Sequence, residues 1–192
     1  MKKPNPKDQL LETAARLLFP NGYRSIGVDT IAAESGIGKM TLYRHYESKD
    51  ELIVAYLRDS NTKFWEAFEK VTSGVDSPRE KLIRFFKSLA EYVNQPACFG
   101  CPFLNVAAEY PDTEYPGHQI ALQHKESVRQ RFYELARQAG ARKPDVLADQ
   151  LFLLMDGTYM TARMYGPKNP ATHVVEAVHT LLDHQITREV NL

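Results

Sequence analysis

Only two of the 192 residues are cysteine, too few for a secreted scaffold held together by disulfides. Long apolar runs are also missing. The longest, residues 151–155, is far shorter than the roughly 20 residues that span a bilayer. No apolar segment follows Lys2 and Lys3, so the sequence shows no export signal. These absences predict a cytoplasmic protein with no membrane association.

Net charge is absent as well, because 24 basic residues balance 24 acidic ones. Residues 1–52 carry eight basic and seven acidic side chains, which is close to neutral. A nucleic-acid function must therefore rest on a local motif rather than on bulk charge. Hydrophobic residues make up 43% of the chain, enough for an apolar core without disulfides or metals.

Apolar residues recur at helical spacing through most of the chain, and no strand-like alternation is present. Pro20-Asn21-Gly22 should stop the first helix, and Ser48 with Glu51 forms a capping box that should start a long one. We therefore expect an all-α protein of about nine helices. The first four are expected at 7–19, 28–33, 39–46 and 49–71. A break at 74–78 follows, and the fifth helix should run from there to residue 94. The others are expected at 104–109, 118–139, 144–165 and 172–187.

Residues 28–47 have the spacing of a helix-turn-helix. Ala32 is small enough for a close helix crossing, and Gly36 tolerates the positive φ of a tight turn. A small core between the helices would be filled by Ile31, Ile37, Leu42 and Tyr46. The third helix should then project outward, with its first turn able to enter a DNA major groove.

The side chains of this third helix are of types that contact DNA bases and phosphates. Lys39 can donate to guanine or phosphate, Thr41 can contact a base edge or phosphate, and Met40 can pack on a thymine methyl. Lys49 begins the next helix, where free N–H groups also favour a phosphate. Asp29 would lie near the DNA backbone, where its charge is unhelpful. The residues expected to contact DNA are Thr30, Gly38, Lys39, Met40, Thr41, Tyr43, Arg44, His45 and Lys49.

The stretch IAAESGIGKMTLYRHY (31–46), followed by SKDEL (48–52), resembles the N-terminal DNA-binding domain of the TetR family of bacterial transcriptional regulators over residues 9–55. The resemblance implies a DNA-binding domain over 1–52 and an effector-binding and dimerisation domain over 53–192. It implies a homodimer that binds a palindromic stretch of double-stranded operator DNA, most often as a repressor, and is released by a small-molecule effector. Catalysis, a cofactor and a metal site are not predicted, since no adequate motif is present.

An effector pocket should be mostly apolar with a few orienting polar groups. The candidate lining residues are Phe64, Trp65, Phe68, Phe86, Phe103, Asn105, Glu109, His124, Phe152, Asp156, Tyr159 and Arg163. Aromatic residues at helical spacing also fill ordinary cores, and that alternative stays open.

Two further features have alternative interpretations. Segments 144–165 and 172–187 each carry an apolar face and resemble the helix pair of the family's dimer interface, yet both faces could instead be intrachain core. Cys98 and Cys101 form a CxxC pair, which we interpret as structural packing. The alternatives are a thiol-redox protein and a metal-binding protein. A structural zinc would need two more ligands, and no second CxxC is present.

Overall fold

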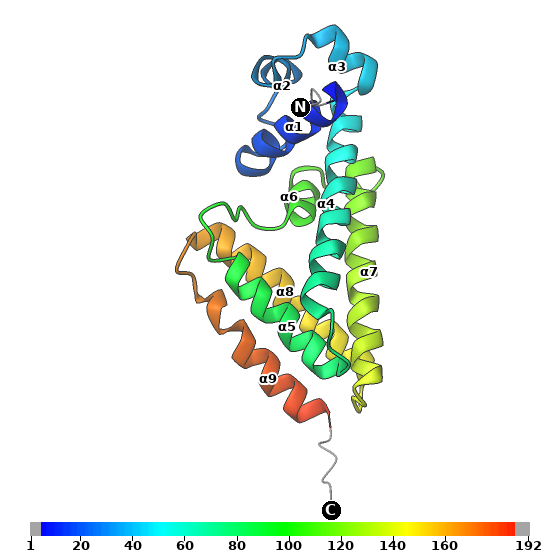
Figure 1. Ribbon diagram of the computed structural model, residues 1–192, viewed down its shortest axis with the longest axis vertical. Helices are drawn as coiled ribbons and strands as arrows, with labels where there is room; N and C mark the ends of the chain where they lie inside the picture. The colour runs from blue at the N-terminus through cyan, green and yellow to red at the C-terminus, as the bar shows by residue number, and fades with distance from the viewer. Residues whose placement is uncertain (1–4, 187–192) are drawn as a thin grey trace, which may run out of the picture. The chain divides into compact units, whose positions relative to one another are not determined.

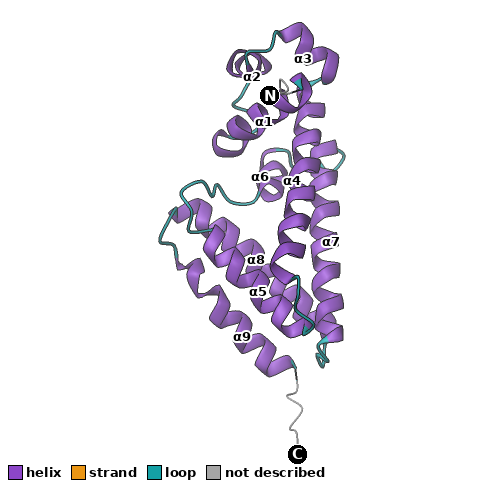
Figure 2. Ribbon diagram, in the orientation of Figure 1, coloured by secondary structure: helices purple, strands orange, loops and turns teal. Residues whose placement is uncertain are grey.

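The structure is a computed structural model that describes residues 5–186. Within that range the chain forms nine α-helices and one 3-10 helix, with no strand beyond a single bridge between Ala141 and Ile186 (Figure 1, Figure 2). The elements are α1 Pro6–Asn21, α2 Val28–Ser35, α3 Lys39–His45, α4 Lys49–Thr72, α5 Pro78–Tyr92, α6 Pro102–Glu109, α7 Pro116–Gln138, α8 Pro144–Tyr165, η1 Pro170–His173 and α9 Val174–Gln185. The all-α prediction is confirmed.

Several predicted helix ends differ from the observed ones by one or two residues, and the differences in α1 and before α9 have a physical cause. Pro20 lies inside α1, which ends at Asn21, because a proline in the last turn removes only one backbone hydrogen bond. Gly22 then closes the helix, and its N–H bonds the Leu18 carbonyl at 2.9 Å. The last predicted helix consists of η1 followed by α9. It starts earlier than predicted because the Asn169 side chain caps η1 by accepting the Ala171 N–H at 3.0 Å. Its predicted end at Thr187 lies outside the described residues.

The chain divides into two compact units. The first contains the described residues up to Lys63 together with Pro102–Gln123, and the second contains Phe64–Cys101 and the residues from His124 onward. Helices α4 and α7 therefore contribute residues to both units. The predicted division at residue 52 is simpler, because it assigns no later segment to the DNA-binding part.

The first unit contains α1, α2 and α3, which pack against one another. Its fully buried side chains include Leu10, Leu18, Tyr23, Ile31 and Leu42. The predicted capping box is present at the start of α4, where the Ser48 hydroxyl accepts the Glu51 N–H at 3.1 Å. The Glu51 carboxylate accepts the Glu47 N–H at 2.8 Å, one residue before the Ser48 N–H that a full capping box would use. The Ser48 contact satisfies one of the donors that the helix start leaves free.

In the second unit α5, α8 and α9 lie side by side (Figure 1). Their apolar faces form one core with α7 and the end of α4. Val178 and Leu182 of α9 are fully buried there, as are Leu147 and Leu151 of α8. The apolar faces that the sequence offered for dimerisation are thus intrachain core, the alternative left open above. No described helix is long and apolar enough to cross a membrane.

Candidate nucleic-acid interface

The turn between α2 and α3 is fixed by backbone geometry. Gly36 has φ 66° and ψ 15°, the left-handed conformation that its position was predicted to need. The Ile37 N–H returns to the Ala32 carbonyl at 3.2 Å, while the Ser35 hydroxyl donates to the same carbonyl at 3.0 Å. These bonds close α2 and set the direction in which α3 leaves it.

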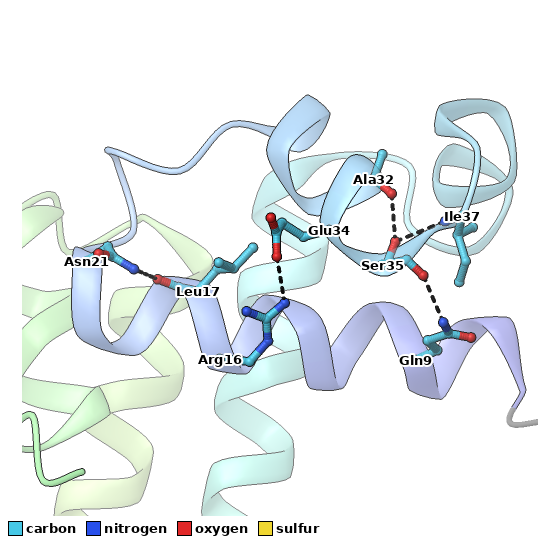
Figure 3. Close-up of polar contacts among 8 residues, drawn as sticks. All are labelled: Gln9, Arg16, Leu17, Asn21, Ala32, Glu34, Ser35 and Ile37. Carbon is cyan, nitrogen blue, oxygen red and sulfur yellow. Dashed lines mark hydrogen bonds and ion pairs between the residues drawn. The ribbon is translucent and has the colours of Figure 1, made fainter. Parts of the chain in front are cut away.

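Side chains of α1 hold this turn in place (Figure 3). The Gln9 amide donates to the Ser35 carbonyl at 2.7 Å, and Arg16 pairs with Glu34 at 3.0 Å. Both contacts join residues that are far apart in sequence, so the spacing of the motif could not predict them. They fix α2 on α1, and through α2 they fix the exposed helix α3.

The outer face of α3 carries the side chains predicted for DNA. Met40 is 83% exposed and Tyr43 42% exposed, while Leu42 of the same helix is fully buried. Lys39 and Arg44 are also exposed, and Thr41 and His45 are half-buried. Its exposure leaves the Met40 side chain available for contact with a thymine methyl.

The backbone at the start of α3 is accessible as well. Gly38 is the exposed N-cap of α3 and has no side chain that could cap the first N–H groups of the helix. Thr30 is exposed on α2. Free N–H groups at a helix start are suited to a DNA phosphate when the helix lies against the backbone.

Lys39 and Asp29 form an ion pair that sequence reasoning missed. The Lys39 Nζ lies 2.6 Å from Asp29 Oδ1, and both side chains are more than half exposed. The hydrogen bond and charge of Asp29 raise the pKa of Lys39. Asp29 therefore pairs with an ammonium that the sequence predicts to contact DNA.

Lys49 is half-buried, unlike Lys39 and Arg44, which are exposed. Its Nζ donates to the Arg24 carbonyl at 3.4 Å, and burial lowers its pKa. The ammonium sits beside the loop that precedes α2. A phosphate contact by Lys49 would have to share the ammonium with this carbonyl.

The effector residues predicted from sequence are divided between the two units. In the second, Phe68, Phe86 and His124 are buried, while Trp65, Phe152, Asp156 and Tyr159 are partly buried and Arg163 is exposed. In the first, Phe103 and Asn105 are buried in α6, and Glu109 binds the N–H groups of Tyr23 and Arg24.

A groove of about 570 Å³ lies in the second unit, and Trp65 is the one predicted effector residue among those that line it. Its lining residues are Trp65, Glu126, Ser127, Gln130, Arg131 and Glu134.

The two cysteines are buried and free of any disulfide. Burial raises the pKa of Cys98, which keeps its sulfur in the less reactive thiol form. Across residues 5–186 no group of three or more His, Cys, Asp or Glu side chains could hold a metal ion.

A helix-turn-helix whose second helix exposes basic, polar and apolar side chains defines a DNA-binding protein. Comparison with known families agrees with this geometry. Residues 10–56 match the family described as bacterial regulatory proteins, tetR family, and residues 78–178 match the tetracyclin repressor-like C-terminal domain. The chain belongs to the TetR family, and it is a transcriptional regulator rather than an enzyme.

Similar proteins cover nearly the whole chain. The crystal structure of SCO4454, a TetR-family regulator from Streptomyces coelicolor, is 28% identical with a TM-score of 0.91, and covers 95% of this chain and 96% of its own. A putative TetR regulator (sav143) from Streptomyces avermitilis is 33% identical with a TM-score of 0.85, covering 94% and 98%. The transcriptional repressor KstR2 of Mycolicibacterium smegmatis is 24% identical over 168 residues, 85% of this chain and 81% of that protein.

The Asp29–Lys39 pair makes a testable prediction about salt dependence. Asp29→Asn removes a negative charge and frees the Lys39 ammonium for a phosphate. We expect tighter binding to nonspecific duplex DNA and a slope of log affinity against log salt that is steeper by about one. Fluorescence anisotropy at several salt concentrations measures both. The control is Asp8→Asn, an equal charge change at an exposed position on α1. A slope equal to that of the control would contradict this role of Asp29.

Proposed function

We propose that this protein is a ligand-responsive repressor that binds a palindromic operator as a homodimer. The exposed face of α3 supports the operator contact, with Lys39, Met40, Thr41, Tyr43 and Arg44 as its members. Each subunit would place α3 in one major groove, so the two half-sites would lie about one helical turn apart. The name of the M. smegmatis relative supports repression rather than activation.

Selection from a pool of random duplexes tests the operator proposal. We expect enrichment of a palindrome with half-sites spaced by about 10 base pairs or a multiple of it. Arg44→Ala should then weaken binding, while the matched change Arg58→Ala, at an exposed position of α4, should not. Failure to enrich any palindrome, or equal affinity of the two variants, would overturn the proposal.

The dimer is proposed to form through an exposed apolar stripe on α8. Leu153 is 68% exposed and Met164 78% exposed, with Val146 and Met160 on the same face of the helix. Gly157 lies between them and would allow a second helix to approach closely. Four apolar side chains in one stripe form a patch that in soluble proteins commonly marks an interaction surface.

Leu153→Asp should therefore shift the protein toward monomers. A charge placed in the interface loses hydration without gaining a partner, so we expect the dimer dissociation constant to rise at least about tenfold. Analytical ultracentrifugation measures the change. Thr180→Asp, at an exposed position of α9, serves as the control. A wild type that is monomeric at micromolar concentration, or an unaffected Leu153→Asp dimer, would count against the stripe.

The effector is proposed to bind the helical second unit. Trp65, Phe152 and Tyr159 are partly buried aromatics there. Asp156 pairs with Lys125, whose Nζ lies 5.6 Å from the centroid of the Phe152 ring. Aromatic surface with a few oriented polar groups is typical of small-molecule sites. A thermal-shift screen of small molecules, followed by an operator-release assay, tests this. A compound that raises the melting temperature and also weakens operator binding is the expected result, and operator binding that no stabilising compound alters would contradict it.

A further inference from the structure

Glu109 caps the turn that leads from α1 into α2. Its Oε1 accepts the Tyr23 N–H at 3.0 Å, and its Oε2 accepts the Arg24 N–H at 2.8 Å. One carboxylate thus holds two consecutive backbone amides from a position 85 or 86 residues further along the chain. Hydrogen bonds from N–H groups to a charged acceptor are the stronger kind in proteins.

The turn itself is shaped to receive this carboxylate. Gly22 has φ 91°, a conformation that side chains rarely adopt, and a Cβ there would lie 3.1 Å from Glu109 Oε1. Tyr23 is fully buried, and its hydroxyl donates to the Pro102 carbonyl at 2.9 Å. The first residue of α6 and the last are therefore both bound to the same turn.

A second set of contacts extends from Glu109 to the start of α4. The Arg24 guanidinium lies over the Tyr110 ring at 4.8 Å, and Tyr110 stacks on Tyr115 with centroids 4.1 Å apart. The Tyr115 hydroxyl donates to Asp50 Oδ1 at 2.9 Å. Residues 109–115 therefore bind the chain both before α2 and after α3, on either side of the helix-turn-helix.

We propose that Glu109 is a positioning residue for DNA recognition. The connection between α1 and α2 is only residues 22–27, so fixing the amides of Tyr23 and Arg24 fixes where α2 begins. The turn after α2 is closed by hydrogen bonds to the Ala32 carbonyl, and α3 follows directly from it. Releasing the carboxylate would let α2 and α3 shift together against the DNA. This role goes beyond the proposed function, because Glu109 is not one of the residues proposed to contact DNA and would affect operator binding only by positioning α2 and α3.

Charge and positioning predict opposite results for Glu109→Gln. The variant removes a negative charge, which by electrostatics alone should strengthen DNA binding. It also leaves an amide that cannot accept from both N–H groups with the strength of a carboxylate. We expect operator affinity to fall about tenfold while affinity for nonspecific duplex is unchanged or higher. Hydrogen exchange at the Tyr23 and Arg24 amides should be faster than in the wild type.

The matched control is Glu114→Gln, an equal charge change at an exposed carboxylate in the same segment. It should leave operator affinity and the two exchange rates as they are. Operator affinity in Glu109→Gln equal to that in Glu114→Gln would overturn the proposal, whereas a wild type that binds no operator would overturn the proposed function instead.

If Glu109→Gln fails to fold, Glu109→Asp provides a second test. It keeps the negative charge but has a shorter side chain, so it should weaken operator binding. Unchanged binding in that variant would also overturn the assignment.

Discussion

Lys125→Met should lower the free energy of unfolding of the second unit by about 3 kcal/mol. Lys125 is only 8% exposed, and its ammonium pairs with the Asp156 carboxylate, whose side chain is 18% exposed. Removing the ammonium leaves Asp156 with a desolvated charge and no partner. Breaking a buried pair in this way costs more than the pair itself contributes, because the remaining ion has already lost its hydration.

Urea unfolding followed by the fluorescence of Trp65, the single tryptophan, measures this change in the second unit. Lys87→Met is the control, since Lys87 is exposed on α5, and it should alter stability by less than about 0.5 kcal/mol. The double variant Lys125→Met, Asp156→Leu should recover most of the loss, because apolar side chains often replace a buried pair at little cost. A Lys125→Met variant no less stable than Lys87→Met would refute the argument.

Acidification from pH 7 to pH 5 should cost the second unit about 2 kcal/mol through His124 alone. His124 is 4% exposed, and its ring meets the Phe64 ring edge-on at 4.8 Å. Burial, aided by the charge of Lys125, lowers its pKa from 6.5 to about 3. The folded protein therefore keeps a neutral imidazole across this whole range of pH.

The sign follows from where the proton binds. Between pH 6.5 and about 3 the unfolded chain takes up a proton on His124 and the folded chain does not. The free energy of unfolding therefore falls as the pH falls through this window. Comparing urea unfolding at pH 7 and pH 5 isolates the effect, because His124→Gln should lose less stability on acidification by about 2 kcal/mol. His184→Gln, at an exposed position, should behave as the wild type does. Equal acid sensitivity of His124→Gln and the wild type would contradict the prediction.

The sequence by itself determined the helix-turn-helix and the helical class. Gly36, the capping box of Ser48 and Glu51, and the apolar spacing around Leu42 all act within a few residues, so local sequence carries their information. The exposed face of α3 follows from the same periodicity. Local signals also located nearly every helix. The predicted end of α1 was too early, because Pro20 is tolerated in its last turn. The predicted start of the last helix was too late, because the Asn169 side chain caps η1 before it.

Only the tertiary structure decided which partner each face and charge would meet. Helical periodicity identifies an apolar face but not what covers it, so it could not tell that Val178 is core while Leu153 is exposed. The Asp29–Lys39 pair and the hydrogen bonds of Glu109 to Tyr23 and Arg24 join residues brought together by the fold alone. The sequence predicts Glu109 as one of the few polar groups in a mostly apolar effector pocket. Its binding to a distant turn depends on packing between separate helices, which residue spacing does not encode.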